Sequence, residues 1–150
     1  MSPIAITGIL GIDHVGIAVP ELSAALDFYQ NSFNGRLLHQ EENSEQGVVE
    51  AMVAIGTDTD SDTGTVIQLL APLTPESTIA RFIDKNGPGM QQLALRVLNV
   101  EEAASQAQAL GIRTLYESPK RGTNGARINF LHPKDCGGVL IELIERSQSA

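Results

Sequence analysis

The sequence predicts an α+β fold of two paired βαβββ modules that form a half-open eight-stranded barrel. The prediction rests on a near repeat within the chain. Ile12–Val19 resembles Met90–Val97 at an offset of 78 residues. Val66–Leu70 resembles Leu140–Ile144 at an offset of 74 residues. One such module leaves a curved four-stranded sheet with an uncovered face, so we expect two modules side by side to cover that face.

The first module is expected to begin with a strand. Apolar alternation and β-branched residues mark Ile12–Val19 as that strand, which Pro20 ends. Apolar residues at helical spacing predict a helix over Leu22–Phe33, with Asn34 and Gly35 as its stop. Three further strands complete the module: Leu37–Gln40, Val48–Ile55 and Thr65–Leu70.

A connecting helix is predicted over Pro75–Asn86, with Thr74 as N-cap and Pro75 at the first helical position. The order then starts again with a strand at Met90–Val97 and a helix over Val100–Leu110, which Gly111 stops. Three strands follow: Ile112–Tyr116, Arg127–Leu131 and Val139–Ile144. We therefore expect a single domain over residues 1–150, with modules at about 11–72 and 89–145 and a connector at about 75–87.

The bulk composition restricts the function. A hydrophobic content of 42% and a charged content of 19% are typical of a soluble globular protein. A net charge of −8 argues against nucleic-acid binding, which needs a basic surface. No apolar run is long enough to span a membrane, and no signal region is visible. The single Cys136 cannot form an internal disulfide, which favours a cytoplasmic location.

Four polar side chains interrupt apolar strands at the repeated positions: His14, Gln68, Gln92 and Glu142. A polar group buried in a strand must find a partner, because leaving it unpaired costs roughly a few kcal/mol. Imidazole, amide and carboxylate groups can all bind a metal ion. We therefore expect the four side chains to surround one divalent ion. The acidic stretch Asp58–Gly64 is not expected to bind calcium, because it lacks the glycine and glutamate of an EF-hand loop; it is interpreted as a hairpin loop.

Nearly the whole chain, from about Gly11 to Ile144, resembles the vicinal-oxygen-chelate superfamily and, within it, the methylmalonyl-CoA epimerases. Five stretches carry the resemblance: Ile12–Ala18, Glu41–Glu50, Ala71–Leu73, Arg127–Lys134 and Gly138–Leu143. The stretches ending at Glu50 and at Lys134 are far more specific than the fold. The resemblance implies a homodimer that acts on methylmalonyl-CoA.

The resemblance also implies roles for single residues. It implies metal ligation by His14, Gln68 and Glu142, and an acid/base role for Glu50 facing Glu142 across the substrate. The chain departs from the family at Gln92, because Gln91 and Gln92 stand where the family usually has two histidines. An amide oxygen is a weaker ligand than imidazole for zinc or cobalt, so manganese or magnesium is also a candidate ion.

Epimerisation at C2 requires removing an α-proton and returning it to the other face of the carbon. Two bases are needed, and Glu50 and Glu142 are the natural pair. Glu50 lies in an apolar strand, where burial would raise its pKa towards a useful value. The coenzyme A phosphates need a basic edge, and the loop over residues 119–127 carries three candidates: Lys120, Arg121 and Arg127.

Two alternatives remain open at this stage. One is a metal-free or weakly metal-binding ligand-binding protein, which Gln92 favours and Glu50 disfavours. The other is a different glyoxalase-like enzyme, such as a glyoxalase or a ring-cleaving dioxygenase. The iron site of a dioxygenase needs two histidines and a carboxylate, whereas only His14 occupies a ligand position here.

Overall fold

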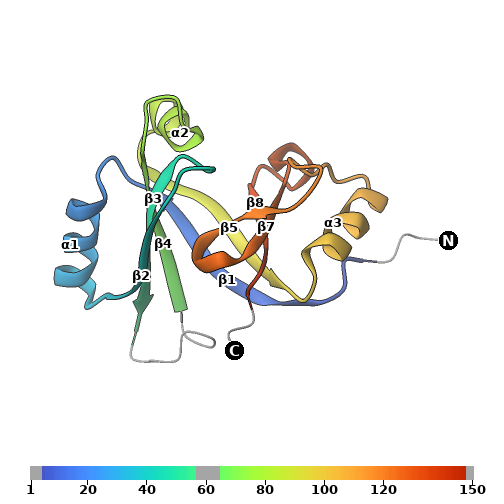
Figure 1. Cartoon of the computed structure of the whole chain (residues 1–150), viewed down its shortest axis with the longest axis horizontal. Coiled ribbons are helices and arrows are strands. Elements are labelled where there is room, and N and C mark those ends of the chain that lie inside the picture. Colours follow the sequence, from blue (N-terminus) through green and yellow to red (C-terminus); the bar gives the residue numbers. More distant parts are fainter. Residues whose placement is uncertain (1–4, 57–64, 148–150) are drawn as a thin grey trace. The chain divides into compact units, whose positions relative to one another are not determined.

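The computed structural model describes residues 5–56 and 65–147, in two compact units. The first unit contains His14–Gln91, and the second unit combines Met1–Asp13 with Gln92–Ala150. Along the chain the elements follow the order βαβββ, a connecting helix, and βαβββ again (Figure 1). The predicted α+β class with paired βαβββ modules is confirmed. The loop expected at Asp58–Gly64 lies outside the described residues.

The sheet of the first unit joins the first and last strands of its module. Its strands are β1 (Ile9–Ala18) from His14 onward, β2 (Arg36–Asn43), β3 (Val48–Ile55) and β4 (Thr65–Pro72). β1 pairs with β4 in parallel, and β4–β3 and β3–β2 are antiparallel. Helix α1 (Leu22–Phe33) packs on β3 and β4 (Figure 1), burying Leu22 with Val53 and Leu69. The apolar periodicity that predicted α1 therefore marks its core side.

The sheet of the second unit has the same arrangement. Its strands are β5 (Gly89–Val97) from Gln92 onward, β6 (Lys120–Arg121), β7 (Arg127–Leu131) and β8 (Ile141–Glu145). β5 pairs with β8 in parallel, and β8–β7 and β7–β6 are antiparallel. Helix α3 (Val100–Ala109) packs on β7 and β8 (Figure 1), burying Val100 with Val97 and Leu143. No helix among the described residues is long and apolar enough to cross a membrane.

The connecting helix begins later than predicted. Helix α2 spans Thr78–Asn86, and its N-cap is Ser77, whose hydroxyl oxygen accepts a hydrogen bond from the Ala80 amide at 3.1 Å. The predicted cap, Thr74, instead accepts a bond from the Ser77 amide with its carbonyl, in a turn that precedes the helix. The Ser77 hydroxyl therefore satisfies one of the first helical amides.

The strand predicted at Ile112–Tyr116 is wrong. Among the described residues, the segment exchanges only two backbone hydrogen bonds with the chain around β7, from Leu115 N to Phe130 O and from His132 N to Arg113 O. Side chains bond to the flanking amides instead: Asp135 accepts from the Arg113 amide at 2.9 Å, and Asn129 accepts from the Tyr116 amide at 3.2 Å. Only Thr114 forms a β-bridge in this segment, to Leu131. The edge strand of the second unit is instead the short β6, which was not predicted.

Candidate active site

The first unit brings three predicted site residues together on one sheet face. Gly16 of β1 is the register partner of Gln68 on β4, and His14 lies two residues before Gly16. Side chains two apart in a strand share a face, so His14 and Gln68 point to the same side. Glu50 enters from β3, opposite Leu70 of β4. The exposed fractions of His14, Gln68 and Glu50 are only 1%, 3% and 3%.

A chain of hydrogen bonds links these three side chains. His14 Nε2 lies 3.1 Å from Gln68 Oε1. The other end of the same amide, Gln68 Nε2, donates to Glu50 Oε2 at 3.0 Å. The amide of Gln68 therefore orients an imidazole and a carboxylate at once, both in an environment that excludes water.

The second unit brings Gln92 and Glu142 together. Ala94 of β5 is the register partner of Glu142 on β8, and Gln92 lies two residues before Ala94 on the same face. Gln92 Nε2 donates to Glu142 Oε1 at 3.2 Å, and both residues are buried. Strand alternation turns Gln91 to the opposite face. Of the two adjacent glutamines, Gln92 is the one that faces the carboxylate.

Apolar side chains surround Glu142 within its unit. Phe130 and Ile128 of β7 lie opposite Glu142 and Ile144 of β8, so all four share one face. Ala94, Ile128, Phe130 and Ile144 belong to one buried cluster. The hydrogen-bonded side chains of Glu142 and Gln92 therefore lie beside an apolar patch of the sheet.

Each unit contains side chains whose chemistry allows them to ligate a divalent ion: the imidazole of His14 and the amide oxygen of Gln68 in the first unit, and the carboxylate of Glu142 in the second. In the structure His14 Nε2 and Gln68 Oε1 are hydrogen-bonded to each other at 3.1 Å. Turning the Gln92 amide over would put its oxygen where Nε2 now lies, 3.2 Å from Glu142 Oε1. No group of three His, Cys, Asp or Glu side chains that could hold a metal occurs in the part of the chain that the structure describes. Any ion bound by the predicted set would therefore depend on amide oxygens.

The three basic residues expected to bind phosphate lie on the β6–β7 hairpin of the second unit. Arg121 of β6 and Arg127 of β7 are register partners. Lys120 is exposed, and its Nζ lies 4.4 Å from the ring centroid of Tyr116. Arg127 forms ion pairs with Glu101 and Glu145, and the hydrogen bond to Glu101 raises the pKa of its guanidinium. The positive charge of Arg127 is thus partly offset by carboxylates.

The hairpin also holds a candidate substrate-binding residue, Thr123, that was not predicted from the sequence. Thr123 is 8% exposed, and its hydroxyl is buried without a hydrogen-bond partner among the described residues. The turn is closed by bonds from the Gly122 amide to Ala126 and from the Ala126 amide to Thr123. A Cβ on Gly122 would lie 2.6 Å from Ile128 Cγ2, so the turn packs tightly on β7. Buried hydroxyls usually have hydrogen-bond partners, so the Thr123 hydroxyl is unusual. The signal in the sequence was the position of Thr123 within the basic loop at residues 119–127.

A second missed feature is a cluster of charged residues in the second unit. Asp13 is buried, and its carboxylate accepts hydrogen bonds from Arg96 and Arg146. A charged residue inside the apolar strand pattern around His14 was the signal for this cluster, but its partners are distant in sequence.

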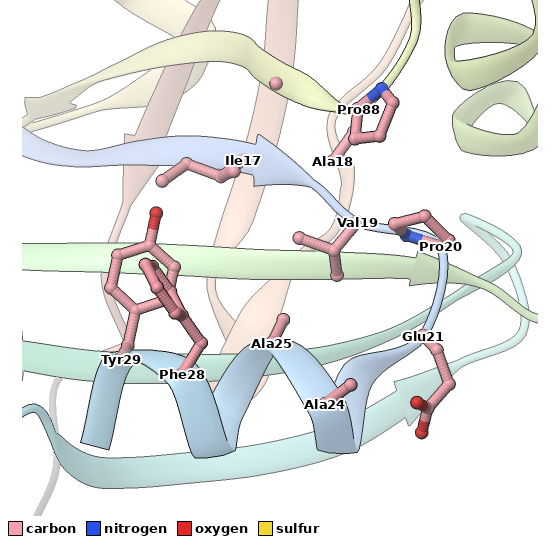
Figure 2. Close-up of a pocket in the computed structure, with 11 residues that line it drawn as sticks. Ile17, Ala18, Val19, Pro20, Glu21, Ala24, Ala25, Phe28, Tyr29 and Pro88 are labelled. Atoms are coloured by element: carbon pink, nitrogen blue, oxygen red, sulfur yellow. The ribbon is translucent and has the colours of Figure 1, made fainter. Parts of the chain in front are cut away.

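A groove of about 460 Å³ lies between α1 and β1 in the first unit. Figure 2 shows Phe28 and Tyr29 at one end of the groove and Pro20 and Glu21 at the other. None of the predicted site residues lines it. Its walls are mainly apolar, so it is not a candidate for the acid/base chemistry.

Comparison with known proteins supplies independent evidence. Residues 13–130 match the Glyoxalase/Bleomycin resistance protein/Dioxygenase superfamily. The mitochondrial methylmalonyl-CoA epimerase of Homo sapiens is 39% identical over 133 residues, which cover 88% of this chain and 72% of the human protein. The crystal structure of methylmalonyl-CoA epimerase from Mycobacterium tuberculosis is 45% identical, with a TM-score of 0.87 over 97% of this chain and 93% of that one. A variant of the Streptomyces coelicolor methylmalonyl-CoA epimerase, in complex with 2-nitronate-propionyl-CoA, is 39% identical to this chain. Its TM-score is 0.87, and the match covers 93% of this chain and 99% of that one.

Proposed function

Because the chain belongs to the methylmalonyl-CoA epimerase family of the glyoxalase, bleomycin resistance protein and dioxygenase superfamily, we propose that it interconverts (R)- and (S)-methylmalonyl-CoA by moving the proton at C2. The observation that carries the proposal is a buried carboxylate in each unit, hydrogen-bonded to an amide at a repeated position. These pairs are Glu50 with Gln68 and Glu142 with Gln92. Epimerisation needs two groups that can accept and return a proton, one on each face of C2.

In this proposal each carboxylate serves one face of C2. One of Glu50 and Glu142 accepts the proton, and the other returns a proton to the opposite face. Gln68 holds the Glu50 carboxylate in a fixed orientation, so little reorganisation is needed when the proton moves. The apolar side chains around Glu142 exclude water that would otherwise compete for the proton.

The main barrier is the negative charge that develops on the thioester oxygen when the proton leaves. A divalent ion held by His14, Gln68, Gln92 and Glu142 would supply Lewis-acid stabilisation of that charge. The nitronate analogue in complex with a variant of the Streptomyces coelicolor relative supports the development of charge on oxygen, because a nitronate carbon is planar and its charge lies on oxygen, as in an enolate. Cobalt, manganese, magnesium and zinc are the candidate ions.

The coenzyme A phosphates would interact with the β6–β7 hairpin. Lys120 and Arg121 are exposed there, and Arg127 lies opposite Arg121. Because Arg127 already pairs with Glu101 and Glu145, we expect Lys120 to contribute more to phosphate binding than Arg127. The homodimer and the cytoplasmic location stay predictions from the sequence. The molar mass of the purified protein, measured by light scattering, tests the prediction of a homodimer.

The decisive experiment is deuterium incorporation at C2 of methylmalonyl-CoA in D2O. The protein is first treated with a chelator and then resupplied with cobalt, manganese, magnesium or zinc. Exchange that returns with metal would support both the proton chemistry and the ion. Exchange without metal would reject the metal requirement alone. No exchange with any ion, in a sample shown to be folded, would reject the epimerase and favour a ligand-binding protein.

A further inference from the structure

We propose that Asp13, held by Arg96 and Arg146, is a positioning residue for His14. This inference rests on the proposed function, in which His14 is a metal ligand. Asp13 itself is not expected to touch the ion or the substrate.

The geometry around Asp13 is that of a fixed carboxylate. Its side chain is 0% exposed. Oδ2 accepts hydrogen bonds from Arg96 Nε at 3.0 Å and from Arg146 Nε at 2.7 Å, and Oδ1 accepts one from Arg146 Nη2 at 2.9 Å. Two parallel bonds from one guanidinium determine the orientation of a carboxylate as well as its position.

The two arginines lie on the strand segments that carry the other candidate ligands. Arg96 is four residues after Gln92 on β5, and Arg146 is four residues after Glu142, directly after β8. Residues Gln92 and Glu142 are themselves hydrogen-bonded. The main chain at Asp13 is therefore attached to the segments that present Gln92 and Glu142.

His14 follows Asp13 directly, so their Cα atoms are about 3.8 Å apart. Asp13 has its partners in the second unit, whereas His14 bonds to Gln68 in the first. A shift or rotation of β1 at Asp13 necessarily moves the imidazole. Replacing the carboxylate would weaken or remove the hydrogen bonds that Arg96 and Arg146 donate to it, and the strand would lose its fixed position.

The test is the substitution Asp13→Asn, which keeps the size of the side chain and removes its charge. The matched control is Asp135→Asn, which breaks another double Asp–Arg contact, with Arg113 at 2.8 and 3.1 Å, in the same unit. The readouts are Co2+ affinity by titration, the visible absorption spectrum of bound Co2+, and kcat at saturating Co2+. Outer groups hydrogen-bonded to a metal ligand typically change metal affinity 10- to 100-fold, and because Asp13 acts on His14 through the main chain, we expect an effect at the lower end of that range.

We expect Asp13→Asn to weaken Co2+ binding about tenfold, to change the spectrum and to lower kcat, and Asp135→Asn to change none of these. Wild-type affinity and spectrum in a folded Asp13→Asn protein would overturn the proposal, even if its melting temperature falls. If that variant does not fold, Arg146→Lys keeps the charge and loses the parallel contact; unchanged affinity and spectrum there would also overturn it. Failure of the wild-type protein to bind Co2+ would instead reject the metal site itself.

Discussion

The amide nitrogen of Gln68 donates a hydrogen bond to the Glu50 carboxylate over 3.0 Å. A candidate metal ligand and the candidate base are therefore directly joined, and the amide oxygen faces His14 at the same time. Any change in the amide orientation changes both ends of this chain of contacts. Metal binding and proton transfer are thus expected to be coupled through Gln68.

Glu50→Gln should abolish turnover while leaving substrate binding nearly unchanged. The new amide has the same shape, and its oxygen can still accept from Gln68, but it cannot take up a proton at neutral pH. We expect kcat to fall by about 100-fold or more. Titration of the substrate by calorimetry measures binding separately. Glu42→Gln on the neighbouring strand β2 is the control, since Glu42 is exposed. Full activity of Glu50→Gln would exclude Glu50 as the base, and a pure binding protein should be indifferent to the change.

Gln92→His should tighten the binding of Zn2+ and Co2+, because imidazole is a better ligand for these ions than an amide oxygen. We expect an increase of about tenfold or more, measured by competition with a chelator. Gln91→His is the control, because the two side chains lie on opposite faces of β5. Equal gains from both substitutions would show that the adjacent position can also reach the ion.

Thr123→Val should stabilise the ligand-free protein and weaken substrate binding. The buried hydroxyl lacks a partner among the described residues, so an apolar side chain of the same shape should raise the free energy of unfolding by roughly 1 kcal/mol. If substrate supplies the missing partner, KM should rise several-fold. Urea unfolding and steady-state kinetics measure the two effects. Thr123→Ser keeps the hydroxyl and should keep KM; a stabilised Thr123→Val protein with unchanged KM would make the hydroxyl irrelevant to binding.

Cys136 should react slowly with iodoacetamide in the folded protein. Burial raises the pKa of its thiol above 9.0, and the nearby Asp135 carboxylate adds to the shift. The folded state therefore holds the thiol proton more tightly than the unfolded state, so this contribution to stability is complete below pH 9.0 and is lost as the pH rises through the folded pKa. Alkylation near that pH should be faster in urea than in buffer. Equal rates would show that the thiol is not protected.

Local sequence patterns predicted much of the fold, and the largest exception is a segment whose backbone bonds to side chains elsewhere in the chain. The strand Val48–Ile55 and the stop of α1 at Asn34 were predicted at their observed positions. The predicted strand at Ile112–Tyr116 was wrong, since Asn129 and Asp135 bond to its backbone. Propensity and alternation do not contain such long-range contacts.

The candidate site shows the same limit. The repeat was enough to single out Gln68 and Glu142, because each interrupts an apolar strand at a corresponding position. It could not reveal that Gln68 bonds to Glu50 or that Asp13 pairs with Arg146, 133 residues away. Pairings of that kind depend on strand register, which a single sequence does not specify.

The second unit is built from two segments that are far apart in the chain, which has a consequence for folding during synthesis on the ribosome. Its first segment, ending at Asp13, pairs with residues that are translated much later, up to Arg146. The first unit, His14–Gln91, is contiguous and is translated in full before those partners emerge. We therefore expect the nascent chain to form the first unit early, while the segment ending at Asp13 waits for β8. The buried carboxylate of Asp13 gains its two parallel contacts only after Arg146 has been translated.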